Sequence, residues 1–241
     1  MNFLQICQRL RRETGLTSSS ATTPTTVVSQ TGQLKDIVDW AASAYTDLQA
    51  SRTNWRWLRS TFTLDTTASD DTYAYSDAAV TDSRLPAAIS RFSRWCPLDS
   101  DGYSNVKSYL TSGGVGSEAY LQYLPWNYFR DIYKKGTQTN GQPLHFTIDP
   151  QDNIIIGPKP DAIYTVTGEY QRSAQTLALD ADTPEMPADY HMVIVWNALL
   201  DYAGKAAAPE VFTRAQVKAA PIMRMLETNQ LPEITFGGTL A

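Results

Sequence analysis

The stretch that most constrains the fold lies toward the C-terminal end, where a helical segment is apolar around most of its circumference. Residues 193–200 read Val-Ile-Val-Trp-Asn-Ala-Leu-Leu and follow the segment Met186–His191. A helix of this kind needs cover from more than one side. Another helical pattern begins at Pro209, and Pro221 is expected to kink it. We therefore expect a bundle in which helices from both ends of the chain pack together.

The N-terminal part supplies the other helices of this bundle. Apolar residues at helical spacing predict a helix over residues 2–14. A Ser/Thr-rich linker over residues 15–29 is long enough for this helix to dock at some distance, including on another subunit. A longer pattern predicts a helix from Gly32 to Leu58. Trp40 lies outside its apolar stripe and suits either a second core contact or a subunit interface, where tryptophan is enriched.

Several side chains are candidates for the bundle core or for a subunit interface. They are Trp40, Tyr45, Trp55, Trp196, Arg52 and Arg56. On a helix that continues to Leu58, Arg52, Arg56 and Arg59 share one face beside Trp55. That face is either solvated or paired with the acidic loops of a neighbouring subunit.

The middle of the chain has a different period. From about residue 61 apolar residues alternate, and Asp149–Asn153 forms a turn between two strand-like segments, which predicts a hairpin. The predicted fold class is α+β. Its expected parts are a helical bundle from residues 1–60 and 181–228, a β-rich insertion over residues 61–180 with a short helix near 125–134, and an extended tail over residues 229–241.

Composition narrows the class of protein. The 241 residues are 42% hydrophobic and 19% charged, as in globular proteins. The net charge of -5 argues against a protein that grips nucleic acid with its whole surface. Cys7 and Cys96 are expected to be free and buried. The sequence has neither an apolar run of about 20 residues nor the order of a signal peptide, which indicates assembly in a cytoplasm.

No catalytic, cofactor-binding or metal-ligating constellation stands out. His145 lies in an expected strand and His191 in the first turn of a helix beside Asp189. The acidic pairs at 70–71, 99–101 and 180–182 are most simply turn residues, although two carboxylates at a suitable separation would also serve glycoside hydrolysis.

Short segments along nearly the whole chain resemble the head–tail connector adaptor family of tailed bacteriophages. They are Phe3–Arg11, Thr31–Trp40, Trp55–Leu58, Leu124–Trp126, Phe129–Arg130, Met186–His191, Ala207–Glu210 and Leu231–Glu233. The resemblance implies a non-enzymatic virion protein without a cofactor. It also implies a homo-oligomeric ring of about twelve copies, docked to the portal on one side and to tail or stopper proteins on the other, with DNA passing through its lumen.

The tail, whose only charged side chain is Glu233, is the expected portal contact. Pro232 and the two adjacent glycines allow it to lie extended in a groove. The residues assigned to this contact are Leu231, Pro232, Ile234, Phe236 and Leu240. Two alternatives stay open at this point: a carbohydrate-binding or tail-fibre-like β module, and, with less support, a glycosidase or lytic enzyme.

Overall fold

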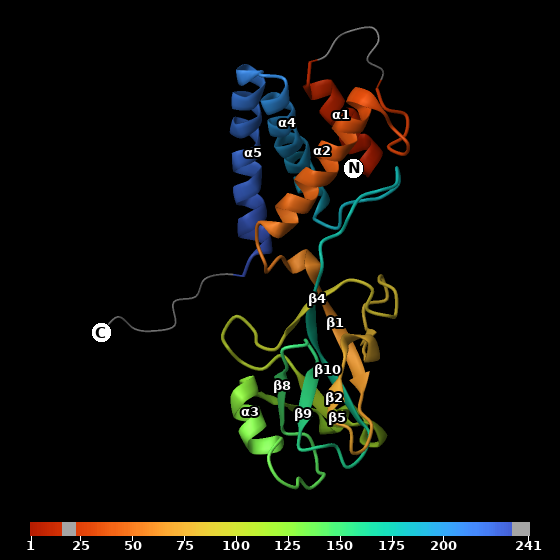
Figure 1. Cartoon of the computed structure of the whole chain (residues 1–241), viewed down its shortest axis with the longest axis vertical. Coiled ribbons are helices and arrows are strands. Elements are labelled where there is room, and N and C mark those ends of the chain that lie inside the picture. The colour runs from red at the N-terminus through yellow and green to blue at the C-terminus, as the bar shows by residue number, and fades with distance from the viewer. Residues whose placement is uncertain (16–22, 233–241) are drawn as a thin grey trace, which may run out of the picture. The chain divides into compact units, whose positions relative to one another are not determined.

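The structure is a computed structural model that describes residues 1–15 and 23–232. Within these residues the chain divides into two compact units (Figure 1). The helical unit comprises residues 1–58 and 174–232, and the β unit comprises residues 59–173. The helices and two sheets confirm the predicted α+β class. None of the helices in the described ranges is long and apolar enough to cross a membrane.

The helical unit is built around one central helix. Its α-helices are α1 (Phe3–Glu13), α2 (Gly32–Ala50), α4 (Met192–Lys205) and α5 (Pro209–Gln230), and its 3-10 turns are η1 (Arg56–Leu58) and η5 (Ala188–Tyr190). Helix α4 packs against the other three. Its residues Val193, Ile194, Val195, Ala198 and Leu199 are all buried, so the predicted cover from several sides is confirmed.

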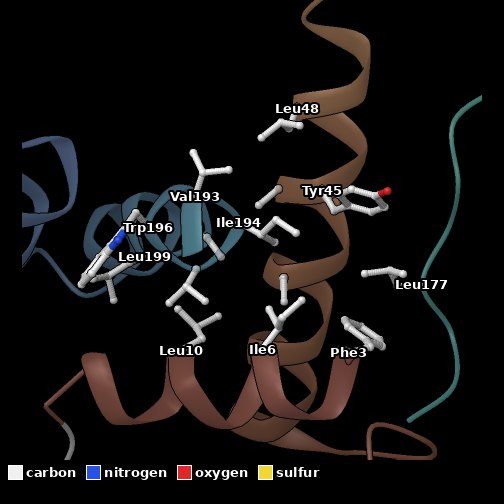
Figure 2. Close-up of a cluster of buried hydrophobic side chains, with 14 of the residues drawn as sticks. Phe3, Ile6, Leu10, Tyr45, Leu48, Leu177, Val193, Ile194, Trp196 and Leu199 are labelled. Atoms are coloured by element: carbon white, nitrogen blue, oxygen red, sulfur yellow. The ribbon is translucent and has the colours of Figure 1, made fainter. Parts of the chain in front are cut away.

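Helix α1 docks on its own chain. A capping box between Asn2 and Gln5 fixes its first turn. Its apolar side faces α2 and α4, as Figure 2 shows for Phe3, Ile6 and Leu10. The Phe3 N–H also donates to the Asp182 carbonyl at 2.7 Å. Within this chain, therefore, the linker does not carry α1 to another subunit.

Helix α2 is shorter than predicted. It ends at Ala50, whereas the sequence pattern had suggested a helix to Leu58. Residues 51–54 read Ser-Arg-Thr-Asn, a run with mostly weak helix propensity. The indole N–H of Trp55 then donates to the carbonyls of Leu48 and Gln49, at 3.2 and 3.1 Å. The chain thus folds back over the end of α2, because a tertiary hydrogen bond satisfies the last turn.

Helix α5 runs without interruption across Pro221 to Gln230. Pro221, where a kink was expected, therefore does not divide the helix in two. The tail expected from residue 229 also begins later, because Leu231 is the first residue with extended backbone angles.

The β unit holds two sheets. The larger has the strand order β3-β1-β10-β5-β6, with β4 also paired to β10, and the smaller has the order β2-β9-β8-β7. The strands are β1 (Arg59–Asp65), β2 (Thr72–Tyr73), β3 (Ala79–Val80), β4 (Phe92–Cys96), β5 (Lys107–Leu110), β6 (Ala119–Tyr120), β7 (Gln122–Tyr123), β8 (His145–Ile148), β9 (Ile154–Gly157) and β10 (Tyr164–Arg172). Antiparallel pairing of β8 with β9 confirms the predicted hairpin.

The short helix α3 (Trp126–Tyr133) packs beside this hairpin, close to its predicted position. Contact is close at Gly157, where an added Cβ would lie 2.7 Å from the Tyr133 ring and 2.9 Å from Phe129. Glycine at this point allows the helix to approach the strand.

Candidate assembly surface of the helical unit

Acidic residues from all three pairs accept hydrogen bonds from backbone N–H groups or form salt bridges. Asp99 accepts from the N–H groups of residues 101 and 103, and Asp182 accepts from those of residues 178 and 179. Asp180 accepts from the N–H of Val27. Asp71 pairs with Lys134 at 2.8 Å. Among the described residues no group of three or more His, Cys, Asp or Glu side chains is arranged to hold a metal ion.

Both histidines form hydrogen bonds within their own units. His145 Nδ1 lies 2.6 Å from the Tyr133 hydroxyl. His191 is buried, with Nε2 3.0 Å from the Met186 carbonyl oxygen and Nδ1 2.8 Å from the Met1 amino group. Its hydrogen bonds thus join the start of α4 to the start of α1 and do not involve the neighbouring Asp189. The two cysteines are buried and free, as predicted, and burial raises the pKa of Cys7 to about 12.

The placement of His191 predicts acid sensitivity of the helical unit. Burial, followed by the nearby Met1 ammonium group, lowers its pKa below the value of about 6.5 that an unfolded chain has. The unfolded chain then binds the proton more readily, so stability is complete above pH 6.5 and falls as pH drops below it. Urea midpoints of the helical unit at pH 7.5 and 5.5 measure this loss, which His191→Gln should reduce.

His145→Gln is the matched control. Burial also lowers the pKa of His145, but this residue lies in the β unit. The control should leave the pH dependence of the helical unit in place. Equal pH dependence in wild type and His191→Gln would contradict the prediction.

Three of the candidate aromatic residues lie in the core of the helical unit. Tyr45 and Trp55 are fully buried and Trp196 is 8% exposed. The Tyr45 hydroxyl donates to the Gln175 side chain at 2.9 Å and accepts from the Glu185 N–H at 3.1 Å. These contacts tie the segment before α4 to α2. Residues without exposed surface cannot contact a neighbour unless the unit opens.

Trp40 is placed differently, at the surface between α2 and α4. Its ring meets Tyr202 edge to face, with 5.9 Å between centroids, and Lys205 Nζ lies 5.4 Å from the Trp40 ring centre. A cleft of about 230 Å³ opens here, lined by Gln33, Asp36, Ile37, Trp40, Tyr202, Lys205 and Ala206. Lys205 also pairs with Asp36 at 2.6 Å, so these two charges neutralise each other.

The predicted arginine row does not form. Because α2 ends at Ala50, Arg52 follows the helix, Arg56 lies in η1 and Arg59 begins β1, so they share no helical face. Arg52 pairs with Glu227 of α5 at 2.8 Å within the same chain. Arg56 is exposed.

The outer face of α5 is a surface that the periodicity argument missed. Ala215, Ala219 and Leu226 are buried on one side of this helix. On the opposite side Val217 is 67% exposed, and Met225, which lies about 100° around the helix from Leu226, is 62% exposed. This side of α5 is therefore a candidate contact surface. The sequence signal for this arrangement is the pair Ala215 and Ala219, because small residues four apart mark the side of a helix that packs closely on another helix.

The cations of α5 divide into two groups. Arg214 is 3.5 Å from the Glu13 carboxylate and donates to the Glu13 carbonyl, which ties α5 to α1. Lys218 and Arg224 have no ion-pair partner among residues 1–15 and 23–232, and both are exposed. From Val217 to Met225 the outer face of α5 is therefore both apolar and basic, while Glu210 is exposed on the same side about two turns earlier.

The proposed portal contacts are only partly covered by the structure. Leu231 is half-buried and packs against the core of its own helical unit. Pro232 is half-buried as well. Ile234, Phe236 and Leu240 lie outside the described residues.

A comparison with protein families identifies a match over nearly the whole chain. A family model described as SU10 adaptor protein matches residues 1–233. This match confirms the resemblance to phage head–tail adaptors that was drawn from the spaced segments. No curated protein matches the chain.

Proposed function

The chain belongs to the SU10 adaptor protein family, a phage head–tail adaptor family, and we propose that its copies form the ring that joins portal to tail. As a member it is a structural adaptor of the virion. In the proposed assembly about twelve copies surround a channel, one side of the ring binds the portal and the other binds tail or stopper proteins. The family match over residues 1–233 is the observation that carries this proposal.

The surface of the helical unit supports an oligomer. Val217 and Met225 are exposed to water in the single chain, and an apolar cleft beside Trp40 is open. Covering these apolar surfaces with another protein would stabilise an assembly. Both features suit a subunit that buries more surface in an assembly. Val217 and Met225 are not part of the core of the bundle, whereas Trp40 packs against that core with part of its ring.

The charge of the chain suits a channel through which DNA moves. Each Lys or Arg that neutralises a phosphate adds affinity and slows release. A subunit of net charge -5 gives a ring that does not hold DNA by a general electrostatic attraction. The adaptor would thus let the genome pass without sequence-specific binding.

The proposed role requires binding and no catalysis. The acidic pairs hold turns and salt bridges, as an adaptor scaffold needs. The β unit offers exposed tyrosines, Tyr103, Tyr120 and Tyr128, as candidate contacts for a tail or stopper protein.

The test is co-assembly with the portal protein of the same phage. We expect the chain to co-purify with portal rings, and negative-stain images to show an added ring with an open centre. A chain that stays monomeric in the presence of assembled portal rings, and is absent from purified virions, would overturn the proposal.

A further inference from the structure

Two faces of the helical unit carry unneutralised charges of opposite sign. The basic stripe is the outer face of α5 with Val217, Lys218, Arg224 and Met225. The second face, called the acidic groove below, combines Trp40 and Tyr202 of the cleft with the exposed Asp47 of α2 and Asp201 of α4, which lie outside the lining of that cleft. The four charged groups form no ion pair among the described residues.

Two charges of the acidic groove have no ion-pair partner among residues 1–15 and 23–232. Asp36 is neutralised by Lys205, and Asp39 by Lys35. Asp47 and Asp201 are left, and both are exposed on the neighbouring helices α2 and α4. Burial and then the Asp47 charge raise the pKa of Asp201. An external cation placed here would offset these two negative charges.

The two faces also agree in spacing. On the basic stripe Val217 and Arg224 are seven residues apart, and on the acidic groove Trp40 and Asp47 are seven residues apart. Seven residues are about two helical turns, or ~10.5 Å, so in each helix both side chains lie on one face. An apolar group and a charge thus recur at the same separation on both faces, with charges of opposite sign.

Pro221 adds a polar group to the basic stripe. It lacks an N–H, so the carbonyl of Val217 loses its usual helical partner on the exposed side of α5. A carbonyl in this position is open to a donor from outside the helix.

We propose that the basic stripe of one copy docks in the acidic groove of the next copy. This inference rests on the proposed ring and names the contact that closes it. In this arrangement Val217 lies over the Trp40 cleft while Arg224 meets Asp47. Lys218 and Met225 complete the contact beside them.

The signs of the charges determine the symmetry of this contact. Two basic stripes facing each other would repel, and so would two acidic grooves. In the proposed ring each copy uses one face toward the preceding copy and the other face toward the following one. Such a head-to-tail contact forms a ring when its rotation closes.

Duplex DNA is the competing occupant of the basic stripe. The stripe offers only two unpaired cations, and exposed Val217 and Met225 lie beside them. Phosphates gain nothing from apolar side chains, whereas a protein interface with an apolar centre and a charged rim does. The composition of the stripe thus favours a second copy.

Two charge-reversal variants test the contact. The first, Lys218→Glu with Arg224→Glu, reverses the basic stripe. The second, Asp47→Lys with Asp201→Lys, reverses the acidic groove. Arg130→Glu on α3 with Lys135→Glu just after this helix controls for net charge, since it makes the same change as the first variant. Circular dichroism and melting curves establish that all of them fold. Ring formation on the portal is measured by electron microscopy and sedimentation.

We expect each reversed variant alone to need about a hundred-fold higher concentration to form rings, and the α3 control to behave as wild type. An equimolar mixture of the two variants should restore rings. In that mixture each copy of one variant meets a copy of the other, and every contact again joins opposite charges.

Other outcomes overturn the inference. If each variant assembles as wild type does, or if the mixture fails to restore rings, the contact is elsewhere while the proposed function stands. If the first variant assembles normally and loses binding to duplex DNA, the basic stripe lines the channel. A wild-type chain that forms no ring with the portal overturns the proposed function together with this contact.

Discussion

Replacing Trp55 with alanine is expected to destabilise the helical unit by about 3–5 kcal/mol, a large share of the total stability of a typical domain. The side chain is fully buried, and its ring stacks on Trp57 with 4.3 Å between centroids. Truncation would open a cavity and would also remove the indole N–H from the carbonyls that end α2. The midpoint of urea denaturation, followed by circular dichroism at 222 nm, measures the loss.

Two further variants separate the causes of this effect. Trp55→Phe keeps most of the buried ring and removes the donor, so it should cost less, about 1–3 kcal/mol. Trp40→Ala removes a tryptophan that is partly exposed, and in the isolated chain it should cost less than Trp55→Ala. A loss below 1 kcal/mol for Trp55→Ala would show that the fold-back after α2 does not hold the unit together.

These tryptophans show where sequence reasoning stops. Helical spacing placed Tyr45 and Trp55 on one apolar stripe, yet Trp55 lies beyond the end of α2. Residues 51–54 contain no proline or glycine, so local signals gave no clear stop. At the end of the helix the Ser51 hydroxyl donates to the Leu48 carbonyl, and the Trp55 indole bonds back to the same turn across six or seven residues. Periodicity cannot foresee these contacts, and the predicted row of Arg52, Arg56 and Arg59 failed for the same reason.

In the β unit the sequence predicts the hairpin between neighbouring strands but not the pairing of strands far apart in the chain. The hairpin of β8 and β9 was predictable because Asp149–Asn153 is a turn in the sequence. The central pairing joins β1 to β10, with Arg59 opposite Gln171, and no local pattern indicates partners so far apart. Alternation predicts that a strand exists, and the partner is set by packing of the whole unit.

The candidate assembly surface was predicted in part. The cluster of Arg214, Lys218 and Arg224 is visible in the sequence, but its members have different roles. Arg214 is held by Glu13, whereas Lys218 and Arg224 are unpaired within the described residues. The difference between Arg214 and the other two cations follows from how α5 packs against α4 and contacts α1. The sequence alone does not give this packing.

Deleting residues 233–241 is expected to abolish binding of the adaptor to portal rings, lowering affinity at least about a hundred-fold. The segment contains Ile234, Phe236 and Leu240 with a single charge, Glu233, a composition that favours burial against a partner. The deletion starts after Pro232 because α5 continues to Gln230 and Leu231 packs on the bundle. Pull-down on immobilised portal measures the effect.

Matched substitutions in the full-length chain separate side-chain contacts from chain length. Replacing Ile234, Phe236 and Leu240 with serine should reproduce the loss, whereas Thr235→Ser with Thr239→Ser should leave binding unchanged. The truncated chain keeps the basic stripe and the acidic groove, so at high concentration it should still associate with itself while failing to bind portal. Full portal binding by the truncated chain would refute the assignment of the tail, and normal binding by the serine variant would show that its apolar side chains are not the contact.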